Sequence, residues 1–284
     1  MEKIQIPCVA CKSRKIKCST ECPLAPIFTP DRSEDFEAVA RVFSAHKFIK
    51  LIKEAEPHQQ VLAADSLVKE AKARIADPVC GLTGTMYKLS CQLEDLRSEL
   101  VLTKQENEVH YKQVGTSSSA LGASRLLQQL DRLGTNPLLP MPSNERSCGA
   151  CRYKRQKCLP QCPFAPFFPP NKKEDFQNIV KVYGGANFMK LVNLAEPHKH
   201  LAADSMIFEA NARISDPVNG LAGIVDTLSQ QLDDLTSELS AVRFHAKRTI
   251  VQEQKSRKKL HSRSTSAMEA SSPAPVTLPF DTVS

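Results

Sequence analysis

Four closely spaced cysteines occur twice in this chain, and their thiolates are the groups best suited to chemistry. Both groups have the spacing C-x2-C-x6-C-x3-C, and they comprise Cys8, Cys11, Cys18 and Cys22, then Cys148, Cys151, Cys158 and Cys162. Four thiolates can surround a zinc ion tetrahedrally at about 2.3 Å, and a site closed by four protein ligands has no open position for catalysis. We therefore predict two structural Zn²⁺ sites, one over residues 8–22 and one over residues 148–162.

Other uses of clustered cysteines stay open at this point. Disulfides need an oxidising compartment, and residues 1–25 lack the apolar core of a signal peptide. An iron–sulfur cluster also takes four cysteines, but we can tie this spacing to no known cluster, and the basic loop suggests no redox role. A redox-active C-x-x-C pair is expected beside a βαβ pattern, which the surrounding sequence lacks. Zinc is the favoured interpretation.

The six-residue arm of each cysteine group is basic. Its cations are Lys12, Arg14, Lys15 and Lys17 in the first group, and Arg152, Lys154, Arg155 and Lys157 in the second. The net charge of +7 permits a polyanionic partner. A metal would fix each loop, so that its cations could meet phosphates and some guanine edges of double-stranded DNA. We expect Arg14, Lys15, Arg152 and Arg155 to contribute most, and specific affinity to need a pair of loops.

The cysteine groups begin two copies of a repeat of roughly a hundred residues. An offset of 140 aligns EDFEAVARVF (34–43) with EDFQNIVKVY (174–183), and an offset of 139 aligns ARIADPV (73–79) with ARISDPV (212–218). A proline-rich spacer comes after each cysteine group, and we expect Phe28, or Phe167 and Phe168, to pack the loop onto the helices beyond the spacer. No apolar run approaches eighteen residues, so we expect no membrane span.

The middle of each copy reads as a block of helices, over residues 33–76 and 173–215. In the first copy, Phe36, Val39 and Phe43 recur at helical spacing. A second helix is expected at about 45–55 and a third at about 59–76. Their predicted inward residues are Phe48, Ile49, Ile52 and Ala55, then Leu62, Leu67, Ala71 and Ile75. No alternating strand pattern of useful length occurs, so the predicted fold class is mainly α.

Each copy then ends in a long helix with a leucine seam, predicted over residues 78–112 and 217–246. Asp77-Pro78 and Asp216-Pro217 are start signals, because Asp is a preferred N-cap and Pro suits the first helical position. Steps of three and four favour a leucine-zipper-like coiled coil over a core helix of the same domain. The predicted dimerisation leucines are Leu82, Leu89, Leu93, Leu96 and Leu100, then Leu221, Leu228, Leu232, Leu235 and Leu239.

The predicted organisation is therefore two tandem zinc-stapled helical domains. They cover residues 6–107 and 146–246, joined by a linker over 113–145 and followed by a basic, then disordered, tail over 247–284. The linker is long enough for the two leucine helices of one chain to pair in parallel, although this would stretch it beyond a relaxed coil. Pairing in trans is the alternative.

The cysteine spacing and the pattern L-x6-L-x3-L-x6-L (Leu82, Leu89, Leu93, Leu100; Leu221, Leu228, Leu232, Leu239) resemble the LATERAL ORGAN BOUNDARIES (LOB) domain of plant transcription factors. The resemblance implies a nuclear protein that binds double-stranded DNA, with zinc on the eight cysteines. It also implies dimerisation through the leucines, with itself or with other LOB-domain proteins. Family members usually carry one such domain. Their middle block typically begins Phe-Gly-Ala-Ser, whereas this chain has Ser44 at the first glycine position.

Two other function classes compete with a DNA-binding regulator. A dimerising adaptor could sequester LOB relatives while binding little DNA itself, with its basic loops merely solvated. An enzyme is disfavoured, because the sequence shows no nucleophile–base constellation, phosphate loop or open metal site. We expect no small-molecule substrate.

Overall fold

The computed structural model describes residues 7–20, 22, 24–112 and 147–269. The predicted linker over 113–145 and residues 270–284 of the predicted tail lie outside the described residues. Every regular element within the described ranges is a helix, and no strand occurs there, which confirms the predicted α class. No helix among these residues is both long enough and apolar enough to cross a bilayer.

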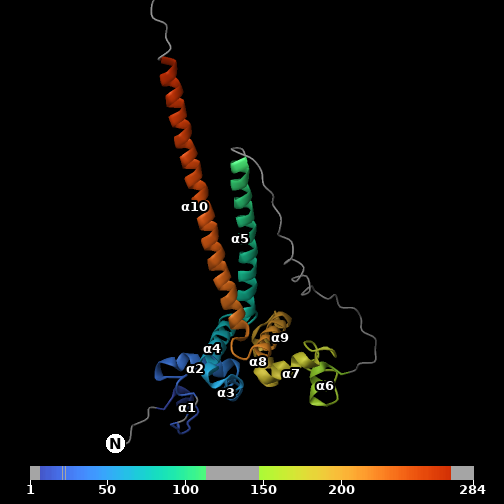
Figure 1. The fold of residues 1–284 in the computed structure, drawn as a ribbon. Helices are drawn as coiled ribbons and strands as arrows, with labels where there is room; N and C mark the ends of the chain where they lie inside the picture. The colour runs from blue at the N-terminus through green and yellow to red at the C-terminus, as the bar shows by residue number, and fades with distance from the viewer. Residues whose placement is uncertain (1–6, 21, 23, 113–146, 270–284) are drawn as a thin grey trace, which may run out of the picture. The chain divides into compact units, whose positions relative to one another are not determined.

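Within the described residues, the two copies repeat the same α-helices in the same order, and the first copy has two short 3-10 helices in addition (Figure 1). The first copy contains α1 (Val9–Ser13), η1 (Pro30–Arg32), α2 (Ser33–Val42), α3 (Ala45–Glu54), η2 (Pro57–Gln59), α4 (Gln60–Ala76) and α5 (Gly81–Lys112). The second contains α6 (Gly149–Lys154), α7 (Lys173–Val182), α8 (Gly185–Leu194), α9 (Lys199–Ser215) and α10 (Gly220–Glu269). The predicted helical blocks therefore begin and end close to where the structure has them.

The described chain forms two compact units. We call the first the head unit; it holds residues 7–94 and 147–232, and so both cysteine groups and the first turns of both long helices. The second, the stalk unit, holds residues 95–112 and 233–269.

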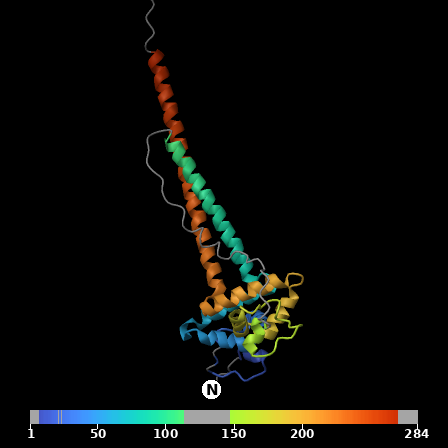
Figure 2. The ribbon, with the colours of Figure 1, turned by 90° about the vertical axis from the view of Figure 1, so that its right-hand side faces the viewer.

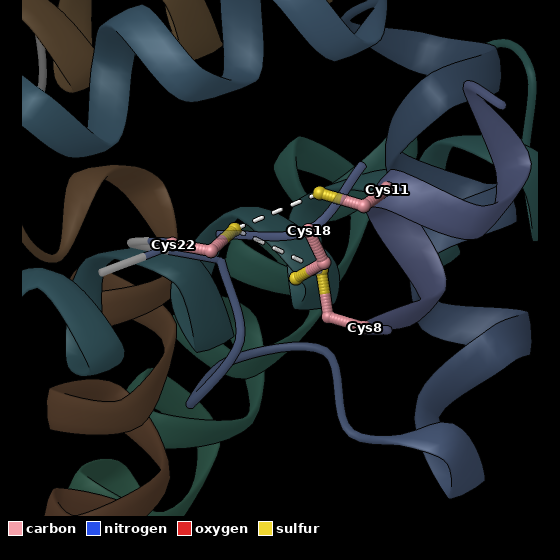
Figure 3. Close-up of side chains that lie close together, drawn as sticks. All are labelled: Cys8, Cys11, Cys18 and Cys22. Atoms are coloured by element: carbon pink, nitrogen blue, oxygen red, sulfur yellow. Dashed lines mark hydrogen bonds between the residues drawn. The ribbon is translucent and has the colours of Figure 1, made fainter. Parts of the chain in front are cut away.

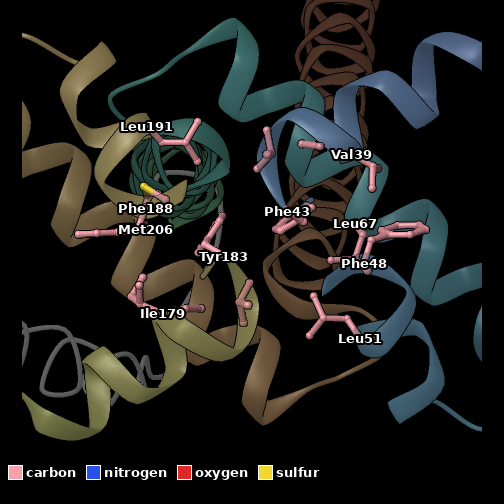
Figure 4. Close-up of a cluster of buried hydrophobic side chains, with 14 of the residues drawn as sticks. Val39, Phe43, Phe48, Leu51, Leu67, Ile179, Tyr183, Phe188, Leu191 and Met206 are labelled. Atoms are coloured by element: carbon pink, nitrogen blue, oxygen red, sulfur yellow. The ribbon is translucent and has the colours of Figure 1, made fainter. Parts of the chain in front are cut away.

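One hydrophobic core serves both copies in the head unit. It contains Val39, Phe48 and Leu67 of the first copy and Ile179, Phe188 and Met206 of the second (Figure 4). Phe43 and Tyr183, at equivalent positions of the repeat, stack on each other across the junction with ring centroids 5.3 Å apart. Because their apolar faces are buried against each other, the two copies lie together in one compact unit with a shared core.

The predicted inward residues are largely correct, with one clear error. Phe36, Val39, Phe43, Phe48 and Ile52 are buried, but Leu62, predicted to face inward, is 54% exposed. The buried face of α4 consists of Ala63, Ala64, Leu67, Val68 and Ala71. Leu62 lies about 100° around the helix from Ala63, which turns it to solvent.

A tight turn separates the helical block from the long helix in each copy. Asp77 Oδ1 accepts hydrogen bonds from the backbone N–H groups of Val79 (3.0 Å) and Cys80 (2.9 Å), and Asp216 does the same for Val218 and Asn219. Gly81 follows with φ of 55°. The long helix therefore begins at Gly81, three residues after the predicted start, and the aspartate caps the turn that precedes it.

The long helices carry all ten predicted seam leucines on buried or half-buried positions. In the head unit, Leu82 and Met86 of α5 form a buried cluster with Leu221, Ala222 and Val225 of α10. In the stalk unit, α5 and α10 run beside each other (Figure 2). Ion pairs join them there, one between Lys104 and Glu238 (2.8 Å) and one between Arg243 and Glu99. α10 continues to Glu269, past the domain boundary predicted at residue 246, so the basic start of the predicted tail is helical.

Candidate metal centres and their basic loops

The four sulfur atoms of each cysteine group lie within 4.8 Å of one another. The side chains of Cys8, Cys11, Cys18 and Cys22 point toward one another (Figure 3). Their Sγ–Sγ distances are 3.9 Å (8 to 22), 3.7 Å (11 to 22) and 3.8 Å (8 to 18). In the second copy, Cys162 Sγ is 3.7 Å from Cys148 and 3.6 Å from Cys151. A tetrahedral ion with metal–sulfur bonds of about 2.3 Å requires sulfur–sulfur edges of about 3.8 Å. Both groups therefore fit a tetrahedral metal ion.

All ten cysteines are free, so no disulfide uses the thiols of either group. Burial raises the pKa of Cys11, and it raises the pKa of Cys148 to about 12. A cation among the sulfurs would favour the thiolate form, so metal binding should release protons and depend on pH.

A short helix opens each cysteine loop and was not predicted. Cys8 and Cys148 occupy the N-caps of α1 and α6, and the next cysteine lies one turn on. The backbone N–H after each first cysteine donates to a carbonyl of the proline-rich spacer, from Val9 to Phe28 (3.1 Å) and from Gly149 to Phe168 (2.9 Å). The C-x2-C spacing could have indicated these short helices, because residues three apart lie on one face of a helix.

The spacer phenylalanines connect each loop to the helices, as predicted. Phe28 is fully buried, with its ring centroid 5.2 Å from that of Phe36 and 5.3 Å from that of Phe48. Phe168 makes the equivalent contacts with Phe176 and Phe188 in the second copy. Each cysteine group is therefore fixed to the shared core on one side.

Lys15 and Arg155, equivalent residues of the two loops, both have left-handed backbone conformations, with φ of 53° and 54°. The following N–H groups close the short helices, Ile16 donating to Cys11 O and Gln156 to Cys151 O, both at 3.1 Å. Helices often end this way, usually with glycine at this position. Here both copies place a cation there instead, at a modest cost in backbone energy.

All eight predicted DNA-contact cations are exposed, but those of the second copy differ in their surroundings. The Nζ of Lys154 lies 4.3 Å from the centre of the Phe164 ring, and Arg152 Nη1 donates to Pro170 O at 3.3 Å. In the first copy, Leu24 stands at the position of Phe164. Lys154 therefore makes a cation–π contact, and Arg152 a backbone hydrogen bond, with residues of the proline-rich spacer of their own copy.

A buried charge network that the sequence analysis missed joins the two copies. Arg74 Nη2 lies 2.7 Å from Glu209 Oε2, and Arg213 Nη2 lies 2.7 Å from Glu70 Oε1. Side chains in both pairs are at most 2% exposed. Arginine and glutamate are four residues apart within α4 and within α9, a spacing that suggests a pair inside one helix. The structure instead pairs each arginine with the glutamate of the other copy.

The same glutamates also contact the beginnings of the long helices. Glu209 Oε1 accepts from the backbone N–H of Leu82, and Glu70 Oε1 from that of Leu221, both at 3.1 Å. Each α5 or α10 N-terminus is therefore capped by a carboxylate of the opposite copy, where a negative charge is favourable. Tyr183 donates a further hydrogen bond to Glu209 Oε2 at 2.7 Å, and burial raises the pKa of Tyr183 well above its usual value.

Comparison with known proteins identifies both copies. The family model of the Lateral organ boundaries (LOB) domain matches residues 7–105 and 147–244. The chain is similar to Protein ASYMMETRIC LEAVES 2 of Arabidopsis thaliana, with 40% identity over 102 residues, 36% of this chain and 51% of the relative. It is also similar to Protein LATERAL ORGAN BOUNDARIES of Arabidopsis thaliana, with 43% identity over 95 residues, 33% of this chain and 51% of the relative.

A third relative is LOB domain-containing protein 6 of Oryza sativa subsp. japonica, with 38% identity over 98 residues, 34% of this chain and 36% of the relative. The chain thus spans about half the length, or less, of these curated relatives. The two matched segments cover most of this chain and begin one residue before each cysteine group. The chain therefore belongs to the LOB domain family, and it carries two LOB domains in tandem.

Proposed function

We propose that this protein is a nuclear transcription regulator that binds double-stranded DNA sequence-specifically through both cysteine loops. The observation that carries the proposal is the pairing of two tetrahedral four-cysteine sites with two exposed basic loops in one compact unit. Cations on a rigid loop can meet phosphates with little loss of conformational entropy, and arginine can also recognise guanine edges. The two loops together would supply more contacts than one.

Zinc is the proposed ion, held by Cys8, Cys11, Cys18 and Cys22 and by their counterparts Cys148, Cys151, Cys158 and Cys162. Four thiolates at tetrahedral spacing suit this ion, and when bound it would supply geometry and positive charge rather than a reaction centre. The protein's own contribution is to fix the loop at both ends: the short helix at one end and the buried spacer phenylalanine at the other.

The proposed DNA contacts are the exposed cations of both loops, with Arg14, Lys15 and Arg155 as the strongest candidates. Arg152 and Lys154 rank after them, because each already has a contact within its own copy. Lys15 and Arg155 have equivalent left-handed backbones, so the two loops would present one cation each in the same way.

We also propose that the two LOB domains of one chain pair with each other, the leucine helices α5 and α10 running as a parallel coiled coil. Support comes from the shared core, the buried cluster of Leu82 and Leu221, and the two ion pairs of the stalk unit. On this proposal a single chain corresponds to the dimer that single-domain relatives would need two chains to form. Light scattering tests it directly, since cis pairing predicts a particle near 31.4 kDa and trans pairing a doubled mass.

Selection of bound duplexes from a random DNA pool tests the DNA-binding proposal. The zinc-loaded full chain should enrich a motif, the enrichment should disappear with a chelator, and two half-sites at a fixed spacing should appear if both loops bind together. The matched variants are Arg155→Ala, which removes a proposed contact, and Lys255→Ala, which removes an exposed cation of α10 outside the loops. Weak, salt-sensitive binding without an enriched motif would support the adaptor alternative instead.

A further inference from the structure

The contacts between the two LOB domains fall into two kinds, and only one kind could distinguish one domain from the other. The buried pairs are reciprocal, since an offset of 139 relates Arg74 to Arg213 and Glu70 to Glu209. The stalk pairs are reciprocal in the same way, with Lys104 equivalent to Arg243. Two first domains, or two second domains, could form all of these contacts. These reciprocal ion pairs would form in mixed and in like pairs of domains, so they do not determine which domains pair.

The ion pair between Lys69 of α4 and Asp226 of α10 is not reciprocal. The same offset places Phe208 at the position of Lys69, and Tyr87 at the position of Asp226. Phe208 is half-buried and packs against the cluster formed by Leu82 and Leu221. One side of the pairing surface therefore has a cation opposite a carboxylate, and the other side has aromatic residues at both positions.

A second asymmetry lies between the α3 and α8 regions. Lys47 of the first domain donates from Nζ to Val180 O at 2.7 Å, whereas its equivalent, Asn187, donates from Nδ2 to Val42 O. Burial lowers the pKa of Lys47. The observed pairing thus has one partly buried ammonium here, whereas two first domains would have two and two second domains none. This contact therefore disfavours pairs of first domains, but by itself it does not favour mixed pairs over the two like pairs together.

We propose that the two LOB domains are a matched pair, in which each pairs with the other in preference to a second copy of itself. The residues that set this preference are Lys69 and Asp226 on one side and Phe208 and Tyr87 on the other. The proposal rests on the domain pairing proposed above, but it does not depend on DNA binding. It also specifies an outside partner: a LOB domain that binds the first domain carries an acidic residue at the position of Asp226.

Pairing of like domains would lose the ion pair in both possible combinations. Two second domains would place each Asp226 carboxylate beside a Phe208 ring, whose negative face does not replace the lost cation. Two first domains would place each Lys69 beside Tyr87, where a cation–π contact offsets only part of the loss. Only the mixed pair places the Lys69 ammonium opposite the Asp226 carboxylate.

The test uses the full chain with a specific protease site inserted between residues 113 and 146, cut after folding and zinc loading. The two halves are allowed to exchange in mild denaturant and returned to buffer, and native mass spectrometry then measures the mixed pair and both like pairs. The readout is the squared amount of the mixed pair divided by the product of the like pairs. We expect this ratio to exceed its statistical value by about tenfold, equivalent to ~1.4 kcal/mol. A ratio at the statistical value overturns the proposal.

Two variants distinguish an effect on the choice of partner domain from an effect on the stability of the paired domains. Tyr87→Asp gives the first domain its own acidic partner for Lys69, so pairs of first domains should increase several-fold and the ratio should fall. Glu99→Gln removes one stalk ion pair when a first domain is paired with a second domain. It removes two when two first domains are paired, and none when two second domains are paired. It should therefore lower stability without changing the ratio. A ratio that responds to Glu99→Gln but not to Tyr87→Asp overturns the proposal, and halves that separate into monomers refute the pairing on which it rests.

Discussion

Ser44 occupies a backbone conformation that normally belongs to glycine. Its φ and ψ are 62° and 149°, and its equivalent in the second domain, Gly184, has 83° and 142°. A non-glycine residue in this region costs about 1–3 kcal/mol. Changing Ser44 to Gly removes that cost but adds about 0.5–1 kcal/mol of unfolded-state entropy. We therefore expect Ser44→Gly to stabilise the head unit by roughly 0.5–2 kcal/mol.

The opposite substitution, Gly184→Ser, tests the same backbone strain in the second domain, because Gly184 has space for a side chain. A Cβ there would meet only Lys47 Cε, at an ordinary distance of 3.8 Å. Gly184→Ser should therefore destabilise through backbone strain alone, by an amount similar to the gain from Ser44→Gly. Thermal unfolding of the zinc-loaded full chain measures both, at about 2–4 °C per kcal/mol for a unit of this size.

Gly185→Ala is the matched control, one residue further along. Its new Cβ would meet Phe164 and Phe176 at 3.7 and 3.8 Å, and the first domain already has Ala45 there. We expect it to stabilise the fold by about 0.4–1 kcal/mol. Gly184→Ser as stable as the unmodified chain, or Ser44→Gly less stable, would refute the reasoning from backbone strain.

Three further outcomes are expected. Arg213→Met leaves Glu70 buried without its partner and should cost about 3–5 kcal/mol by denaturant unfolding, while adding Glu70→Leu should restore much of the loss. Cys18→Ser should reduce the zinc content measured by elemental analysis from two ions per chain to one, and Cys91→Ser, outside both groups, should leave it at two. In DNA titrations, Arg155→Ala should weaken binding more than Lys154→Ala, because Lys154 is held over Phe164; an equal loss would contradict that ranking.

The local parts of the fold were predictable because short-range chemistry sets them. Pro57 and the aspartate–proline turns interrupt the helices. The spacing of Phe36, Val39 and Phe43 predicts an amphipathic helix where the structure has α2. The start of α5 was placed three residues early because Asp77-Pro78 also fits a helix N-terminus. Only the glycine at 81, with its positive φ, reveals the intervening turn.

The candidate metal sites were predictable for the same reason, since four ligands within fifteen residues need no knowledge of the rest of the fold. The buried charge network was not. Glu70 and Arg74 form a plausible pair within α4, and nothing in their spacing indicates that Glu209 and Arg213 are the true partners. Such partners depend on how the two copies pack, which is a property of tertiary structure.

The balance of these contacts suggests how a small preference could decide the pairing. In the reciprocal network, removal of either partner costs about 3–5 kcal/mol, because it leaves the other charge buried and unpaired. The exposed Lys69–Asp226 pair is weak by comparison, typically below about 1 kcal/mol. In one chain, however, the two domains meet at an effective concentration of the order of millimolar. The covalent connection between the domains would therefore favour the mixed pair within one chain. Once that pair has formed, the asymmetric contacts need only prevent exchange of domains between chains.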